Sequence, residues 1–198
     1  MDIVAASAIR ELLPRTQGPV ILAETGAVNP GHAGPFKYYA KDKEGTLLHD
    51  ALFAAFFCGS AGCGQIWHWD EHYVDRNNLW WQFGRFANAI KGVDPVKEKF
   101  RPFYTECHQV RLYGLRGEKT TLIWMRDKRC DWKSELEGGK PAEVIANGWL
   151  PIRNCTFECY DPWSDKWTSI AAPKLPPFRR SLVVKMPTTA IDGMADCN

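Results

Sequence analysis

The sequence predicts a mixed fold, in which an α/β segment is followed by an all-β domain built as an antiparallel sandwich. In the first half of the 198 residues, short apolar runs bounded by turn formers alternate with helix-type segments, which is typical of strands buried on both faces. After Val93-Asp94-Pro95 the pattern changes to short segments separated by Gly, Pro, Asn and Asp, as in a sandwich. We therefore expect domains at residues 1–97 and 98–190, followed by a tail at 191–198.

The first domain is expected to contain three helices and two strands. Thr46 stands where an N-cap belongs, and the apolar residues after it occupy most of a helix circumference, which indicates a buried helix. Gly59 and Gly92 stand where the second and third helices end. The helices are expected at residues 1–13, 47–57 and 78–91, and the strands at 19–23 and 64–70.

The second domain is expected to consist of short strands joined by tight turns. The segment from Asp161 to Trp167 is typical of a hairpin turn with aromatic flanks. The strands are expected at residues 107–115, 120–125, 143–145, 156–160 and 181–185.

Composition excludes several classes of protein. The formal net charge is +2, and Lys and Arg are scattered, so neither a nucleic-acid groove nor a membrane-surface patch is indicated. No run approaches the roughly 20 apolar residues that span a bilayer, and residues 1–13 do not resemble a signal peptide. We therefore expect a soluble protein without nucleic-acid or membrane partners. Nine tryptophans are the unusual feature of the composition.

The seven cysteines do not match common zinc-site spacings. Cys155 and Cys159 look like a pair, but on one strand they would lie roughly 13 Å apart, too far for a disulfide. We expect most of the thiols to be reduced and buried.

Glu24 is the strongest candidate for a functional residue. It ends the apolar run 19–23 and opens a loop that contains His32, a candidate for substrate contact. The second predicted strand ends in Trp67-His68-Trp69-Asp70. Because the carboxyl ends of parallel strands meet at one edge of a sheet, we expect both strand ends to face one pocket.

Trp67 and Trp69 are two positions apart, so they share a face if the segment is a strand. An indole offers a flat apolar surface on which a sugar ring can stack, and core packing is the alternative role for each. His68 and His72 flank Asp70 and Glu71, but this is not the helical His-Glu-x-x-His arrangement and no third ligand is evident. We therefore expect no metal and no cofactor.

These motifs together resemble the C-terminal part of a clan-A glycoside hydrolase, the cellulase and mannanase relatives that combine a (β/α)8 barrel with a trailing β-sandwich. Ala23-Glu24-Thr25-Gly26 matches the end of the seventh barrel strand, where the family carries its glutamate nucleophile. The helix and turn at residues 45–62 resemble the connection that follows. Trp67-His68-Trp69-Asp70 resembles the eighth strand, which brings a tryptophan to the floor of the subsite for the attacked sugar. Residues 175–182 resemble the last strand of the sandwich.

The resemblance covers residues 18–187 and implies a partial TIM barrel, its last two βα units, before the sandwich. It implies that Glu24 is the nucleophile of a retaining β-glycanase and that β-linked oligo- or polysaccharides contact Trp67, Trp69 and His32. Barrel strands one to six, with the Asn-Glu pair that supplies the acid/base, have no counterpart. The resemblance therefore implies a fragment or remnant with little hydrolase activity of its own, although full-length relatives are often secreted.

Two parallel strands leave both sheet edges open, so the barrel part is expected to associate with a second copy or with the missing N-terminal barrel half, or to pack unusually against the sandwich. Two other interpretations remain open. In the first, the protein is a carbohydrate-binding or assembly module whose working part is the β-sandwich, and in the second it is a structural relic. The candidate sugar-binding tryptophans of the sandwich are Trp124, Trp132, Trp149, Trp163 and Trp167.

Overall fold

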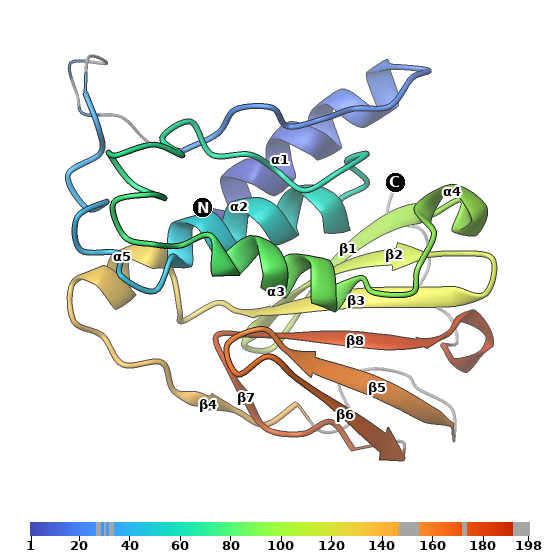
Figure 1. Ribbon diagram of the computed structural model, residues 1–198. Coiled ribbons are helices and arrows are strands. Elements are labelled where there is room, and N and C mark those ends of the chain that lie inside the picture. Colours follow the sequence, from blue (N-terminus) through green and yellow to red (C-terminus); the bar gives the residue numbers. More distant parts are fainter. Residues whose placement is uncertain (27–28, 30, 32–33, 147–154, 172–173, 192–198) are drawn as a thin grey trace. The chain divides into compact units, whose positions relative to one another are not determined.

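The computed structural model describes the chain apart from residues 27–28, 30, 32–33, 147–154, 172–173 and 192–198. The described residues form two compact units, each of which can be followed in Figure 1. One unit comprises Met1–Ala87 and Trp132–Gly139, and the other comprises Asn88–Asp131 and the described part of Lys140–Asn198. The expected boundary at residue 97 thus differs from the observed division, because residues 132–139 return to the first unit. Within the described residues there is mixed helix and sheet and no closed barrel.

The first unit is mainly helical, and the second is mainly β. The helices are α1 Asp2–Leu12, η1 Leu13–Arg15, α2 Thr46–Phe57, α3 Trp81–Ala89, α4 Pro95–Glu98, α5 Trp132–Leu136 and η2 Thr188–Ala190. The strands are β1 Arg101–Cys107, β2 Val110–Arg116, β3 Thr120–Asp127, β4 Glu143–Val144, β5 Thr156–Asp161, β6 Lys166–Ala171, β7 Phe178–Arg179 and β8 Ser181–Pro187.

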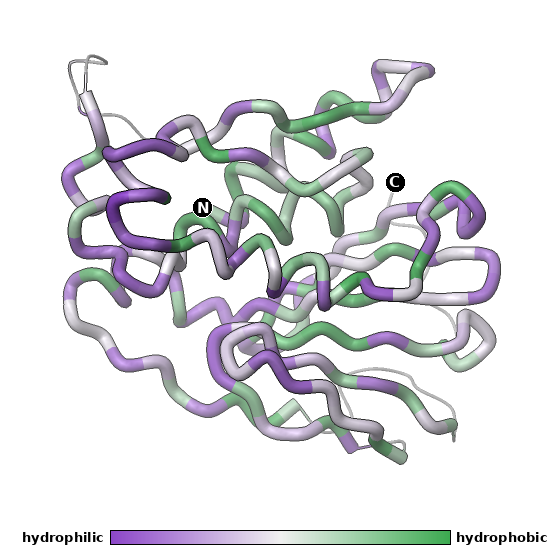
Figure 2. Tube along the Cα trace, in the orientation of Figure 1, coloured by the Kyte–Doolittle hydropathy of each residue, from purple (hydrophilic) through white to green (hydrophobic). Residues whose placement is uncertain are grey.

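Helix α2 is the centre of the first unit. All of its residues are buried, and Figure 2 shows hydrophobic residues along most of its length. Thr46 is the first helical residue and not the N-cap, which is Gly45 in the left-handed region at φ 71°. The free amides of the first turn are satisfied by Asp42, whose carboxylate accepts from Thr46 N (2.8 Å) and Leu47 N (2.9 Å). Asp42 therefore supplies the capping interaction expected from Thr46.

The second unit is built on a six-stranded antiparallel sheet with the strand order β1-β2-β3-β8-β5-β6. β1 and β2 form a hairpin in which Cys107 pairs with Val110 across a two-residue turn. His108 occupies the left-handed region of this turn, at φ 47°. The single strand expected at 107–115 is therefore wrong, since the turn falls inside it. His-Gln is not a typical turn dipeptide, and this explains why the pattern does not reveal the hairpin.

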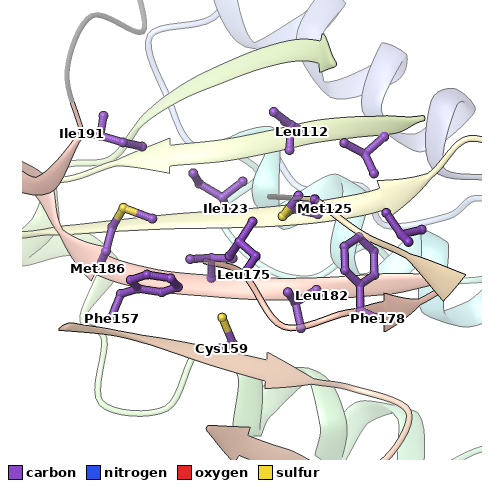
Figure 3. Close-up of a cluster of buried hydrophobic side chains, with 14 of the residues drawn as sticks. Leu112, Ile123, Met125, Phe157, Cys159, Leu175, Phe178, Leu182, Met186 and Ile191 are labelled. Atoms are coloured by element: carbon purple, nitrogen blue, oxygen red, sulfur yellow. The ribbon is translucent and has the colours of Figure 1, made fainter. Parts of the chain in front are cut away.

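β4 and β7 form a separate two-stranded sheet, in which Val144 pairs with Phe178. Both side chains are buried in the hydrophobic core on one face of the six-stranded sheet. Figure 3 shows Phe178 and Leu175 in the same cluster as Met125 and Leu182. The described residues thus contain one large sheet and one small sheet, instead of the two larger sheets of the expected sandwich.

The central strands of the large sheet are buried on both faces. On β3, Ile123 belongs to the core of Figure 3, while the neighbouring Trp124 points to the opposite face and is fully buried there. The Trp124 ring stacks on Tyr113 of β2, with the ring centroids 5.2 Å apart. Trp124 is therefore a core residue, and the sugar-binding role considered for it does not apply.

The cysteines described by the structure, at positions 58, 63, 107, 130, 155 and 159, are all free thiols. Burial raises the pKa of Cys58 and of Cys159 to about 12. These two thiols are therefore protonated at neutral pH. Among the described helices, none is both long and apolar enough to cross a membrane.

Candidate functional site

The candidate site lies where two short segments run parallel in the first unit. Thr25 and Ile66 form a parallel bridge, in which Thr25 N donates to the Gln65 carbonyl (2.9 Å) and Trp67 N donates to the Thr25 carbonyl (2.8 Å). These hydrogen bonds place residue 24 beside residues 65–67. The neighbourhood of the two segments is the one expected from their sequence positions.

Neither segment forms the regular strand expected at 19–23 or 64–70. The Gln65 amide donates to the Leu22 carbonyl (2.9 Å), whereas a regular ladder through Thr25 and Ile66 would use Ala23. Two residues, Ala23 and Glu24, therefore lie between the two accepting carbonyls, where a regular ladder has one. The extra residue interrupts the pairing as a bulge does. The contact is a single bridge, and the strand assignments are wrong to that extent.

Glu24, Trp67 and Trp69 line one pocket of about 240 Å³. Trp67 is 54% exposed, Trp69 is 61% exposed, and Glu24 is exposed as well. Large aromatic side chains are usually buried, as Trp124 is, so core packing does not account for these two indoles. The remaining lining residues are Ala23, Gln65 and Ile66.

Gly26 turns the chain directly after Glu24 and Thr25. It has φ 126°, a conformation that glycine adopts without strain. A Cβ at this position would lie 2.7 Å from Tyr39 Oη and 3.1 Å from Ile66 Cγ1. The glycine that follows the candidate acid is thus required both by its backbone conformation and by the close approach of Tyr39.

His68 differs in burial from the exposed indoles on either side of it. Its side chain is buried near Tyr39 and His72, with ring centroids 5.4 Å away in each case. Burial lowers the pKa of His68, so the imidazole is neutral near pH 7. Within the described part of the chain, its Nδ1 has no hydrogen-bond partner. His32, the loop histidine expected to contact substrate, lies outside the described residues.

The group most similar to a metal site is formed by three consecutive residues, Asp70, Glu71 and His72. One ligand-type atom from each lies within 4.8 Å of the others. The Asp70 carboxylate also accepts from His72 N (3.1 Å), which is a local turn interaction. His68 does not belong to this group, so the structure does not join the two histidines as ligands of one ion.

Two further residues belong to the surroundings of the pocket. Gln65, which the sequence does not single out, lines the pocket, and its Nε2 donates to Cys63 Sγ (3.2 Å). Trp80 is 45% exposed, and its Nε1 donates to Asp75 (3.2 Å), whose own amide donates to the Trp69 carbonyl (3.2 Å). A tight turn therefore connects Trp80 to the pocket segment, a link that the sequence does not signal.

No protein-family model, no curated protein and no solved structure matches this chain. The interpretation of the pocket therefore depends on its residues and their geometry.

Proposed function

We propose that the pocket at Glu24 is a saccharide site derived from a retaining β-glycanase, with Glu24 as its nucleophile. The observation that carries the proposal is the lining of one open pocket by a single carboxylate and two exposed indoles. The indoles supply stacking surfaces, and the carboxylate accepts hydrogen bonds from sugar hydroxyls. Under this proposal, residues 1–97 correspond to the last two βα units of a (β/α)8 barrel, and residues 98–190 correspond to its trailing β-sandwich.

The proposal implies binding with little turnover. In a retaining mechanism the carboxylate attacks the anomeric carbon and forms an ester bond. The bond to the leaving oxygen breaks, and a second carboxyl group roughly 5 Å away protonates that oxygen. Among the described residues that line the pocket, only Glu24 is acidic. General acid catalysis contributes on the order of 100- to 10,000-fold, so natural glycosides are expected to be hydrolysed very slowly.

The test uses 2-deoxy-2-fluoro glycosides that carry a dinitrophenolate leaving group. Dinitrophenolate departs with the bonding electron pair and needs no proton, so a nucleophile alone is sufficient for the reaction. Intact-mass spectrometry of the full chain should show one added fluoroglycosyl group, and peptide mapping should place it on Glu24. Glu24→Gln should abolish the labelling, whereas Asp70→Asn, the matched control, should retain it. Trp67→Ala and Trp69→Ala should slow it.

Absence of labelling across β-glucosyl, β-mannosyl and β-xylosyl reagents would contradict the proposal. Labelling that persists in Glu24→Gln would contradict it equally, because the reacting carboxylate would then lie elsewhere. In the first case, a carbohydrate-binding module or a structural relic would be the better interpretation.

The same proposal includes a partner for the open edge beside Glu24. Residues 20–25 pair with 61–67 on one side only, and no backbone hydrogen bond of Ile21 or Ala23 exists within the described residues. Ile21 is 61% exposed. An unpaired edge with apolar side chains favours pairing with another chain.

We therefore expect self-association, or binding of a separate barrel half, through residues 20–25. Light scattering of the purified chain should show a species larger than 22.5 kDa, and Ile21→Lys should shift it towards the monomer. Val96→Lys is the control, because Val96 is an exposed apolar residue elsewhere. A monomer at all concentrations, without a separate barrel half present, would exclude self-association.

A further inference from the structure

The second unit contains a pocket of about 470 Å³ that the Glu24 site does not use. Its walls come from β4, from the turn between β5 and β6, and from the junction of β7 with β8, whose strands can be followed in Figure 1. The lining residues are Pro141, Glu143, Asp161, Trp163, Ser164, Pro177, Phe178, Arg179 and Arg180. Segments that are distant in sequence thus meet around one cavity, as in typical small-molecule sites.

Arg180 is held in an unfavourable backbone conformation at this pocket. It has φ 63°, in the left-handed region that residues with a Cβ seldom adopt. Its carbonyl accepts from Asp127 N (2.9 Å) and from Arg126 Nη1 (3.1 Å), and both donors are on β3. Strain that is fixed by such contacts occurs preferentially at functional positions.

The strained residue positions an aromatic wall. The guanidinium carbon of Arg180 lies 4.4 Å from the ring centroid of Trp163, and Trp163 Nε1 donates to Ser181 Oγ (3.1 Å). Asp161 accepts from Trp163 N (2.9 Å) and from Ser164 Oγ (2.7 Å), so the turn that carries the indole is fixed as well. Trp163 is only half-buried and is therefore a rigid stacking surface that lines the cavity.

Glu143 and Arg179 complete the pocket rim. They are directly opposite each other in the β4–β7 register, and both are exposed. Within the described residues neither forms an ion pair. A carboxylate that accepts and a guanidinium that donates are thus adjacent at the opening. The two arginines of the pocket balance its two acids, so the pocket does not select for a charged ligand.

We propose that this pocket binds a neutral saccharide, which stacks on Trp163 while Glu143 and Arg179 bind neighbouring hydroxyl groups. The site is separate from Glu24 and does not depend on the function proposed above. It assigns a ligand-binding role to the unit that contains the six-stranded sheet.

The test is affinity electrophoresis of the full chain in native gels that contain hydroxyethyl cellulose, galactomannan or xylan. We expect retardation in at least one gel. Trp163→Ala should weaken the apparent affinity about tenfold, and Trp163→Phe should retain part of it. The double variant Glu143→Gln with Arg179→Gln changes only exposed side chains and should also weaken binding. Trp167→Ala is the matched control, because Trp167 contacts Tyr160 in the same hairpin, with tilted rings whose centroids are 5.0 Å apart, and does not line the pocket.

Two results would overturn the proposal. In the first, the wild-type chain, the Trp163 variants and the Glu143/Arg179 double variant are retarded equally, while Trp67→Ala or Trp69→Ala loses retardation. This result would place all binding at the Glu24 pocket. The other is absence of retardation in all three gels. Labelling of Glu24 is measured separately, so failure at one site remains distinguishable from failure at the other.

Discussion

Replacing Asp42 with alanine is expected to lower the free energy of unfolding by about 3–5 kcal/mol. The Asp42 side chain is buried and accepts from Thr46 N (2.8 Å), Leu47 N (2.9 Å) and Tyr73 Oη (2.6 Å). Alanine would leave two amides and one hydroxyl unsatisfied at the buried start of α2. Urea unfolding followed by circular dichroism measures the change. A loss below about 1 kcal/mol would mean that water replaces the carboxylate.

Asp42→Asn removes the ionisable group, although its NH2 group cannot accept and at least one of the three hydrogen bonds is lost. Burial raises the pKa of Asp42 above its ordinary value of 3.8, and its hydrogen bonds offset this only in part. The folded protein therefore binds this proton more tightly than the unfolded chain does. The contribution of Asp42 to the free energy of unfolding falls as the pH rises from 3.8 to the pKa in the folded state. The free energy of unfolding of the wild type minus that of Asp42→Asn, plotted against pH, should slope downwards over that interval. An upward slope would contradict a raised pKa for Asp42.

Gly64→Ala is expected to destabilise the protein by about 3 kcal/mol and to slow labelling of Glu24. A Cβ on Gly64 would lie 2.4 Å from the Ala51 carbonyl oxygen and 2.9 Å from Ala55 Cβ. Both atoms belong to the buried helix α2, so the segment that carries Trp67 would have to move away from it.

Gly62→Ala is the matched control, because nothing lies within 4 Å of a Cβ built there. Its effect should stay within about 0.5 kcal/mol. Thermal unfolding and the labelling rate measure the two consequences. Equal stability of the two variants would show that the segment is not held against α2 at Gly64.

Sequence patterns predict the parts of this fold that depend on local chemistry. Helix α2 is predictable because its residues are apolar around most of the helix and a glycine follows its end. The strands β3, β5 and β8 are predictable as short runs between turn formers. The grouping of Glu24 with Trp67 and Trp69 follows from the positions of these residues at the ends of two segments that lie side by side.

Features that depend on distant side chains are not predictable in this way. Helix α5 joins the first unit because Trp132 contacts Phe36 (5.2 Å between centroids) and Tyr38 (5.6 Å), and because Tyr38 Oη donates to Glu137 (2.8 Å). No local pattern links residues so far apart in the chain. The pocket at Trp163 depends on the backbone conformation of Arg180, which is set by contacts with β3.

The return of α5 to the first unit has a consequence for biosynthesis. Residues 1–87 are translated before Trp132. The contacts of Phe36 and Tyr38 with Trp132 can therefore form only after β1, β2 and β3 have been synthesised. The large sheet is completed later still, because β8 lies between β3 and β5 and comes last in sequence among the described strands of that sheet. Neither unit can therefore complete its packing while its own first segment is being translated, and the large sheet forms only after β8 has been synthesised. Before β8 has been synthesised, apolar surface of both units is exposed. A chaperone would be needed during this interval.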